Sequence, residues 1–514
     1  MVVVFDNQLT NLPANQAHRQ AREATAASMQ APLVAQLNQV RATHITTLSL
    51  LNAVAATMPA AEAQALSHTP GVKAVVPDRT VIIGEATSTT PTVAASQVQK
   101  STIPAMAADG QQFCNPSPGH PLLEPEALTS IHATDAWPIA TGQGVLVGNV
   151  EADDIAGNPN MIRPNGQHVI IDAPNPNENV FSDEFNGDVS TIAAQGTVTY
   201  TYASQLPFSN IPANCSFRVM GDAPGASLVT TGYFSDTNSH GQIVAPESQV
   251  IAGLQQAVND GVNVVSESYG YGTPLPGAND DLLVPANDAM VAAGVVVVES
   301  AGDSGSAGTV EPPAYDPNVI DAAGTNDLRL LAQADGYTKG WLDDNMTTLS
   351  SGGTTPLGDV VDLAAPGYLA LAPVGVGNTM NLPTEGFGGT SESAPFISGA
   401  AADVIQAYRD THGGTTPTPA QVKEILTSTA TDIGADADQQ GSGLLNIYAA
   451  VEAARQMPGT SDTHSNAREL VDNPTQLDVQ GAGGSTVNTS VTLYNASHNT
   501  ERVTGTYRAL GNET

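Results

Sequence analysis

The sequence predicts an α/β protein built on a parallel β-sheet with helices on both faces, and two observations lead to this prediction. Between residues 125 and 457, short runs of continuous apolar residues alternate with stretches of helical periodicity. Strands that are apolar on both faces are typical of a parallel sheet covered by helices on either side. The composition also changes before and after this region, which divides the chain of 514 residues into the units 1–85, 86–124, 125–457 and 458–514.

The first unit, residues 1–85, is predicted to be a small α+β domain. A strand is expected at residues 2–5, followed by a helix at about 16–40 and a second helix at about 59–67. Gly71 then opens a turn that leads into a strand. Residues 86–124 are rich in Ser, Thr, Pro, Gln and Gly, which is the composition of a linker.

The central unit is predicted from its repeated order of strand and helix. Apolar runs of four residues are too short for buried helices and therefore indicate strands. The predicted strands cover 144–147, 262–265 and 295–298, and the predicted helices cover 251–260, 284–293 and 392–408.

The last unit, residues 458–514, changes to an alternation of Thr, Val and Asn, clearest at 485–494. Alternating patterns of this kind indicate half-buried strands. We expect the first strands of a β-sandwich, cut short where the sequence ends.

The charge balance excludes several classes of function. The chain has 16 Lys and Arg against 51 Asp and Glu, a formal net charge of −35, so we expect no binding to nucleic acid. Two explanations of the acidity stay open: solubility, and adaptation to an acidic medium. No run of about 20 apolar residues is present, so we expect no membrane span.

The start of the chain and its cysteines bear on its location. The sequence opens directly on the strand at 2–5 with no visible signal peptide, so we expect that an upstream segment is missing. The two cysteines, Cys114 and Cys215, exclude a cysteine-rich zinc fold. One disulfide between them and two free thiols both stay open; in an exported protein we expect the disulfide.

The strongest functional signal is the sequence GGTSESAP at 388–395. Glycines permit a tight turn, and Ser391 follows it where a helix begins, so its hydroxyl is exposed near helix-terminal N–H groups. The segment resembles the nucleophile motif Gly-Thr-Ser-x-x-x-Pro of the subtilisin-like peptidases. The resemblance implies that Ser391 is a catalytic nucleophile.

Further segments resemble the same family and occur in the order that it requires. They include Trp137 with the strand that follows it, and three short motifs. These are GDAPGASL at 221–228, NVVSESYG at 263–270 and DLAAPG at 362–367. The resemblance implies a subtilisin-like domain over 125–457, an inhibitory prodomain over 1–85, and a peptide-binding edge made of Ser268, Tyr269 and Gly270.

The catalytic partners of a subtilisin are missing from the sequence. Glu151 stands where an Asp is expected after the first strand, and no His-Gly-Thr-His motif is present. His168 is the only nearby histidine in order and remains an alternative base, although it lies in the strand-like run HVII. We expect His240 to be a surface-loop residue.

A second resemblance, to the serine-carboxyl peptidases called sedolisins, accounts for these departures. Asp303 replaces the oxyanion Asn of subtilisins, and Glu184 and Asp188 have the four-residue spacing of the sedolisin carboxylates. Residues four apart share one face of a helix, so both carboxyl groups can point to Ser391. The interruption by Asn186 and Gly187 is unfavourable for a helix. The role of Glu151 stays open.

These resemblances imply a secreted serine endopeptidase that hydrolyses polypeptides at acidic pH and carries its own prodomain as an inhibitor. Ser391 would be the nucleophile, Glu184 the base, Asp188 its orienting partner, and Asp303 the oxyanion donor when protonated. We assign no cofactor and no metal site, and a structural calcium ion cannot be assigned to any residue. The alternative is a catalytically inactive member that uses its peptide groove for binding.

Overall fold

The computed structural model describes residues 1–84, 122–123, 125–151, 158–171, 183–201, 216–231, 236–239, 242–271, 281–327, 345–355, 359–373, 384–458, 470–477, 486–497 and 499–505. Its first unit is the predicted α+β domain, in which four antiparallel strands take the order β2-β3-β1-β4. Val3 of the central strand packs against Leu33 and Leu37 of the long helix α1. The elements are β1 (Val2–Phe5), α1 (Arg19–Gln39), β2 (Thr43–Leu48), β3 (Ala53–Thr57), α2 (Ala60–Leu66) and β4 (Val72–Val76).

The central unit is built on a seven-stranded sheet in the order β10-β7-β13-β14-β15-β16-β17. Its first six strands are parallel, and β17 pairs with β16 in the antiparallel direction. The strands are β7 (Leu146–Asn149), β10 (Ser227–Thr230), β13 (Val264–Glu267), β14 (Val296–Ser300), β15 (Ile320–Asn326), β16 (Leu363–Pro373) and β17 (Thr384–Gly388).

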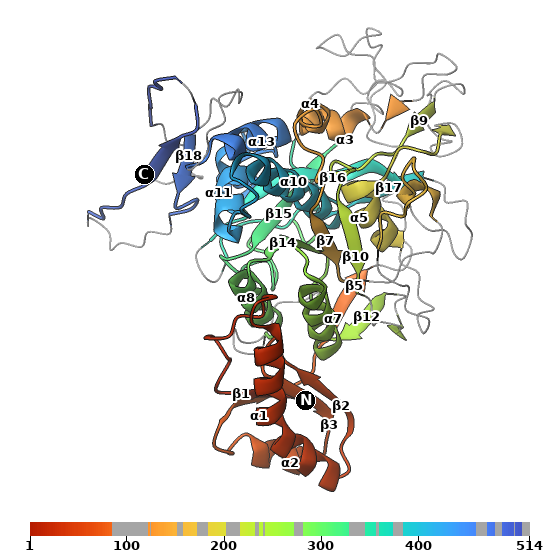
Figure 1. Cartoon of the computed structure of the whole chain (residues 1–514), viewed down its shortest axis with the longest axis vertical. Coiled ribbons are helices and arrows are strands. Elements are labelled where there is room, and N and C mark those ends of the chain that lie inside the picture. Colours follow the sequence, from red (N-terminus) through yellow and green to blue (C-terminus); the bar gives the residue numbers. More distant parts are fainter. Residues whose placement is uncertain are drawn as a thin grey trace.

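Helices cover both faces of this sheet, as Figure 1 shows. Val264 and Val296 point into the core formed with α10 (Thr390–Thr411) and α13 (Ile447–Gln456). Their neighbours Val265 and Val297 point into the opposite core, beneath α7 (Glu247–Asp260) and α8 (Leu283–Ala293). Adjacent strand residues thus serve different cores, which is why these strands are apolar throughout.

Shorter elements complete the described part of the chain. Small sheets take the orders β6-β9-β8, β11-β12-β5 and β18-β19. Their strands are β5 (Thr80–Gly84), β6 (Leu122–Leu123), β8 (Tyr200–Thr201), β9 (Ser216–Arg218), β11 (Asp236–Thr237), β12 (Ile243–Pro246), β18 (Leu470–Asn473) and β19 (Thr492–Asn495). The remaining helices are α3 (Pro125–Ser130), α4 (Ala133–Ala136), the 3-10 turn η2 (Pro159–Met161), α5 (Asp183–Ala193), α11 (Pro419–Ser428) and α12 (Ala437–Gln440).

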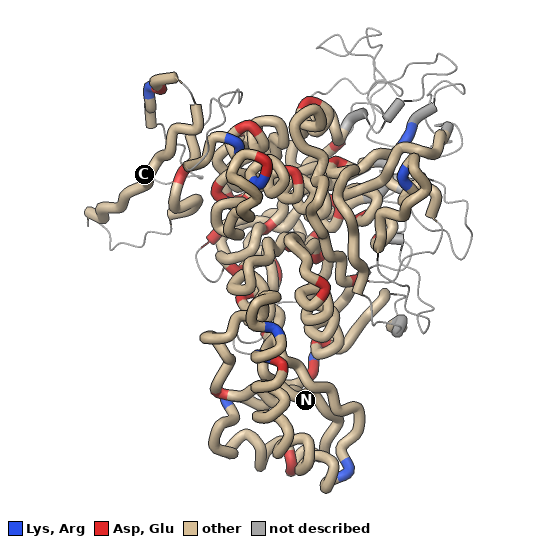
Figure 2. The backbone as a smooth tube through the Cα atoms, viewed as in Figure 1, with Lys and Arg blue, Asp and Glu red and all other residues tan. Residues whose placement is uncertain are grey.

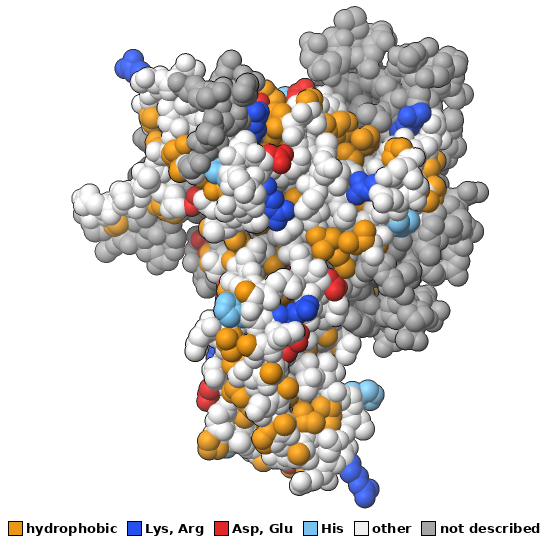
Figure 3. Space-filling view, viewed as in Figure 1, with side chains coloured by type: hydrophobic (Ala, Val, Ile, Leu, Met, Phe, Trp, Pro, Cys, Tyr) orange, Lys and Arg blue, Asp and Glu red, His pale blue; other side chains and the backbone are white. Residues whose placement is uncertain are grey.

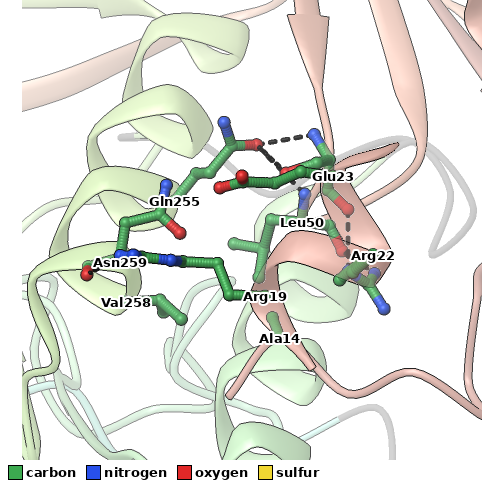
Figure 4. Close-up of a pocket in the computed structure, with 9 residues that line it drawn as sticks. Ala14, Arg19, Arg22, Glu23, Leu50, Gln255, Val258 and Asn259 are labelled. Atoms are coloured by element: carbon green, nitrogen blue, oxygen red, sulfur yellow. Dashed lines mark hydrogen bonds between the residues drawn. The ribbon is translucent and has the colours of Figure 1, made fainter. Parts of the chain in front are cut away.

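The first unit docks onto the central unit below α7 (Figure 1). Oε1 of Gln255, on α7, accepts the backbone N–H groups of Ser49 and Leu50 at 2.6 and 3.1 Å, as the close-up in Figure 4 shows. Arg19 of α1 donates to the carbonyl of Asn259 at 2.7 Å. The loop after β2 and the start of α1 therefore contact the C-terminal end of α7, from Gln255 to Asn259.

Arg22, beside this contact, ties the loops of the first unit together. Its side chain is 4% exposed. Its guanidinium donates to the carbonyl oxygens of Gln8, Leu9, Leu12, Ser49 and Leu50 at 2.6–3.2 Å.

The predicted fold class is confirmed, and the element positions differ by a few residues. β7 begins at Leu146 rather than at residue 144, because the N–H of Val145 bonds to the carbonyl of Gly142 and closes a turn there. The expected C-terminal strands are represented in the described residues by the pair β18 and β19.

The distribution of charged residues in the structure agrees with the acidic composition of the sequence. Figure 2 shows acidic residues throughout the central unit and few Lys and Arg, and in the view of Figure 3 charged side chains are sparse. Among the described residues, no helix has the length and apolar character that crossing a bilayer would require.

Candidate active site

Ser391 lies in the first turn of α10, directly after a glycine turn. Gly389 has a φ of +98°, a conformation that side chains with a Cβ rarely adopt. A Cβ on Gly389 would also lie 2.3 Å from Oδ2 of Asp303. Gly389 is therefore needed both for the turn and for the approach of Asp303 to the segment that carries Ser391.

Pro395 leaves the main-chain carbonyl of Ser391 available for a second contact. In an α-helix the N–H of residue 395 would bond to the carbonyl of residue 391, and proline has no N–H. Oγ of Ser268 donates to that carbonyl at 3.1 Å instead. The Ser-x-x-x-Pro spacing thus couples the turn that carries Ser391 to the end of β13.

A buried pair of carboxyl groups lies next to Ser268. Glu151, just beyond the end of β7, and Asp188, on α5, are fully buried and hydrogen-bonded to each other. Oε1 of Glu151 accepts the N–H of Ser268 at 3.1 Å, and Nδ2 of Asn149 lies 3.4 Å from Oδ2 of Asp188. β7 and β13 are neighbours in the sheet, which brings their carboxyl ends to one edge.

Burial keeps these two groups protonated in acid. It raises the pKa of Glu151 to about 7, against which the bonds from Asp188, Ser268 and Asn149 act weakly. Burial also raises the pKa of Asp188 well above its ordinary value, and repulsion from Glu151 and Glu184 raises it further. Both raised pKa values favour the protonated form, in which a carboxyl group can donate a hydrogen bond.

Glu184 lies one turn before Asp188 on α5, as the spacing predicted. Asn186 and Gly187, which we expected to weaken the helix, lie within it, and Asn186 is fully buried. That expectation is wrong, because α5 packs against α10 and tertiary packing outweighs intrinsic propensity. Glu184 is half-buried, so it is the more accessible carboxyl group of the two on this helix.

Asp303 lies in the loop after β14, against the turn that precedes Ser391. Its Oδ1 accepts the N–H of Thr390 at 2.8 Å and is 3.2 Å from the hydroxyl of the same residue. That hydroxyl in turn accepts the N–H of Gly302 at 2.9 Å. Asp303 is exposed and adjacent to Ser391 in space, although 88 positions separate them.

The predicted peptide-binding edge is occupied by the chain's own β5. Gly270 and Ile82 exchange both main-chain hydrogen bonds, at 2.8 and 3.2 Å, in the antiparallel direction. On its other side β5 pairs with β12. Tyr269 is buried.

His168 occupies a different setting from these groups. It pairs with Ile162 in an isolated antiparallel bridge, and its Nδ1 lies 3.2 Å from the carbonyl of Ile170. His240, Cys114 and Cys215 lie outside the described residues. Within the described ranges, no group of three or more His, Cys, Asp or Glu side chains is arranged to hold a metal ion.

Sequence reasoning left two features of this site unassigned. Glu151 was an open question, and its bond to Asp188 joins residues that are 37 positions apart. Ser268 was expected only as part of the binding edge, yet it contacts both the carboxyl pair and Ser391. The only sequence feature that pointed to Glu151 was its position after the first strand of the predicted parallel sheet.

Two family models match the chain. The model described as the subtilase family covers residues 188–450, and the model described as peptidase inhibitor I9 covers residues 2–83. The first match begins at Asp188 and includes Ser391, Asp303 and the Ser268–Gly270 edge.

Curated relatives agree with these matches. Subtilisin E of Bacillus subtilis is 31% identical over 46% of this chain and 52% of its own length. Mycosin-1 of Mycobacterium tuberculosis is 28% identical over 67% of this chain and 77% of its own length. The chain spans about half the length of the first of these relatives.

Proposed function

Because the chain belongs to the subtilase family, we propose that it is a serine endopeptidase that hydrolyses polypeptides through an acyl-enzyme on Ser391. The observation that carries the proposal is the placement of Ser391. It begins α10, where helix-terminal N–H groups favour developing negative charge, and Asp303 lies against the same turn. This placement is what a nucleophile in acyl transfer requires.

We further propose that the base is Glu184, in the manner of the sedolisins that the sequence resembles. A carboxylate serves as a base below neutral pH. Asp188 orients it by sharing the proton that burial keeps on the Asp188 carboxyl group. Glu151 extends this network to the N–H of Ser268 as a positioning residue.

Asp303 is proposed as the oxyanion donor. In its ionised form a carboxyl group only accepts hydrogen bonds, so Asp303 can stabilise an oxyanion only when protonated. This requirement adds to the preference for acidic pH that the base imposes.

The first unit is proposed to act as an intramolecular inhibitor and as the first substrate. β5 lies along the Gly270 edge, and an antiparallel register that pairs Ile82 with Gly270 places Gly84 opposite Ser268. Since Ser268 contacts Ser391, the peptide bond that follows Gly84 is the one we expect to be cut first. This position lies within the wider stretch from Val81 to Leu128 in which cleavage is expected from composition.

Export remains a prediction, and so does a disulfide between Cys114 and Cys215. In the chain-entropy model, a loop of this length would give about 3–5 kcal/mol of stabilisation.

The test compares the wild-type chain with Ser391→Ala on incubation from pH 3 to 8. Wild type is expected to release a first unit ending at Gly84 and to hydrolyse denatured casein best in acid, while Ser391→Ala stays intact and inactive. Intact-mass analysis identifies the cut. If both chains mature alike in the absence of other proteases, self-cleavage is wrong, and a mature chain that binds casein without cutting it would be the inactive groove-binding member.

A further inference from the structure

A carboxylate outside the proposed catalytic network lies between the binding edge and the loop of Asp303. Oε1 of Glu311 accepts a hydrogen bond from the hydroxyl of Ser304 at 3.2 Å. The main-chain N–H of Glu311 donates to the carbonyl of Ala301 at 3.4 Å. A Cβ built on Gly270 would lie 3.9 Å from Oε2 of Glu311, and one built on Gly302 would lie 3.8 Å from its Cγ. Glu311 therefore lies across the gap between the ends of β13 and β14.

The register of β5 shows which substrate side chain enters this gap. Ile82 lies opposite Gly270, and directly opposite residues of an antiparallel pair project from the same face. Val81 and Ile83 are fully buried on the face toward α7, so positions 82 and 84 project from the other face. That is the face on which a Cβ of Gly270 would meet Glu311.

Position 84 is also the position next to the nucleophile. It lies opposite Ser268, whose hydroxyl contacts the carbonyl of Ser391. A substrate residue in this place supplies the carbonyl that is attacked, and its side chain projects from the same face as Ile82, the face on which Glu311 lies beside Gly270. Gly270 and Gly302 carry no side chains, so neither position fills the space beside the carboxylate with side-chain atoms.

We propose that Glu311 is a specificity-determining residue, and that it favours substrates with Arg or Lys immediately before the bond that is cut. A guanidinium or ammonium group can form a charge-assisted hydrogen bond with a carboxylate, which is stronger than a bond between neutral groups. The inference rests on the proposed peptidase activity and names its substrate class.

The chain's own first cleavage does not use this contact. Gly84 has no side chain, so the first unit reaches the nucleophile by its covalent attachment and the pairing of β5 rather than through Glu311. Self-cleavage therefore separates the two claims: it depends on Ser391 and is independent of Glu311.

The test uses matured enzyme and pairs of peptides that differ only before the scissile bond, Arg against Gln and Lys against Met, at pH 5. We expect wild type to favour the basic member by at least tenfold in kcat/KM and Glu311→Gln to lose that ratio. Glu311→Lys should favour Glu over Gln at the same position. Glu501→Gln, the same change on an exposed C-terminal segment, should keep the wild-type ratio.

Three results are decisive. Equal rates for Arg and Gln peptides with wild type, or a ratio that survives Glu311→Gln, overturn the inference while casein hydrolysis and self-cleavage leave the proposed function intact. A wild-type chain that cuts no peptide and no casein overturns the proposed function, and this inference with it. Loss of the ratio in Glu311→Gln with normal self-cleavage supports both.

Discussion

Asp188 is the residue whose proton matters most to the proposed mechanism. If both groups were ionised, Asp188 and Glu184 would repel each other. A protonated Asp188 can instead donate a hydrogen bond to the Glu184 carboxylate. Burial and its carboxylate neighbours raise the pKa of Asp188, and burial raises that of Glu151 to about 7. As pH rises through the raised pKa of Asp188 this group loses its proton, so the orientation of Glu184 and the activity should both be lost.

The first prediction concerns Glu184 and Asp188. Glu184→Gln and Asp188→Leu should each lower kcat by orders of magnitude, because one removes the base and the other removes the hydrogen-bond donor that orients it. Circular dichroism and thermal unfolding at pH 5 should show a folded protein in both cases. His168→Ala is the matched control and should retain activity; loss of activity in this control together with a normal Glu184→Gln enzyme would replace the carboxylate base with a histidine.

Asp303→Asn gives a separate prediction about the oxyanion donor. An amide donates a hydrogen bond without needing a proton, so part of the activity should survive and extend toward neutral pH. The pH profile of kcat/KM measures this directly. A profile of unchanged shape would mean that Asp303 only holds Thr390.

The residues of the site were predictable in part. The i, i+4 spacing of Glu184 and Asp188 is local, so the sequence predicted their common helix face. The bond between Asp188 and Glu151 depends on the order of β7 and β13 in the sheet, which no local pattern encodes. Likewise, the two contacts of Ser268 arise only where strand ends and the start of α10 meet.

At the scale of elements, α7 shows why helix boundaries escaped the sequence. We predicted its start at residue 251, and it begins at Glu247. Asp78 of the first unit accepts the N–H and the hydroxyl of Ser248 at 2.9 and 2.7 Å, which satisfies the helix start from 170 positions away. Periodicity identifies the apolar face of a helix, but a partner so distant in the chain decides where the helix begins.

Two neighbouring strands of the sheet carry an unusual buried pair. Glu267 of β13 and Glu299 of β14 lie directly opposite each other, are fully buried and share Asn287, which donates to Glu299 at 2.6 Å. Burial raises the pKa of both carboxyl groups, and repulsion between them raises that of Glu299 further. The buried pair is therefore stable only when at least one of its two carboxyl groups is protonated.

The third prediction follows from this pair. A carboxyl group whose pKa is raised by folding stabilises the fold below its unfolded pKa and loses that contribution as pH rises through the folded pKa. Glu299→Gln should thus unfold at a higher temperature than wild type at pH 8, by roughly 2–4 °C for each kcal/mol gained. At pH 4 no gain is expected, and a gain at both pH values would point to better packing instead of charge.

At the scale of the whole molecule, buried carboxyl groups with raised pKa values recur in other elements. Asp403 on α10, Asp222 packed against Gly399 of that helix, and Asp321 in β15 are fully buried, and burial raises their pKa values well above the ordinary range. Burial likewise raises the pKa of Glu247 to about 7. The chain has 51 acidic and only 16 basic residues, so few cations are available to pair with the buried carboxyl groups named here.

The last prediction is therefore a stability curve that falls as pH rises. Because these folded-state pKa values are raised, their contribution is present below about pH 4 and is lost progressively through pH 7. Thermal unfolding of the Ser391→Ala chain between pH 3 and 8 measures the curve without self-digestion. A maximum at pH 7 to 8 would contradict it and would leave solubility as the explanation of the acidity.

The contacts of Arg22 predict the genetic effect of replacing it. One side chain holds five carbonyl oxygens of the first unit, and a lysine, with three donors on a single nitrogen, cannot reproduce that geometry. Under the proposed function the unit that Arg22 organises restrains the peptidase. A missense change at Arg22 would then behave as a gain of function, releasing proteolysis early, whereas a change at Ser391 would be a simple loss.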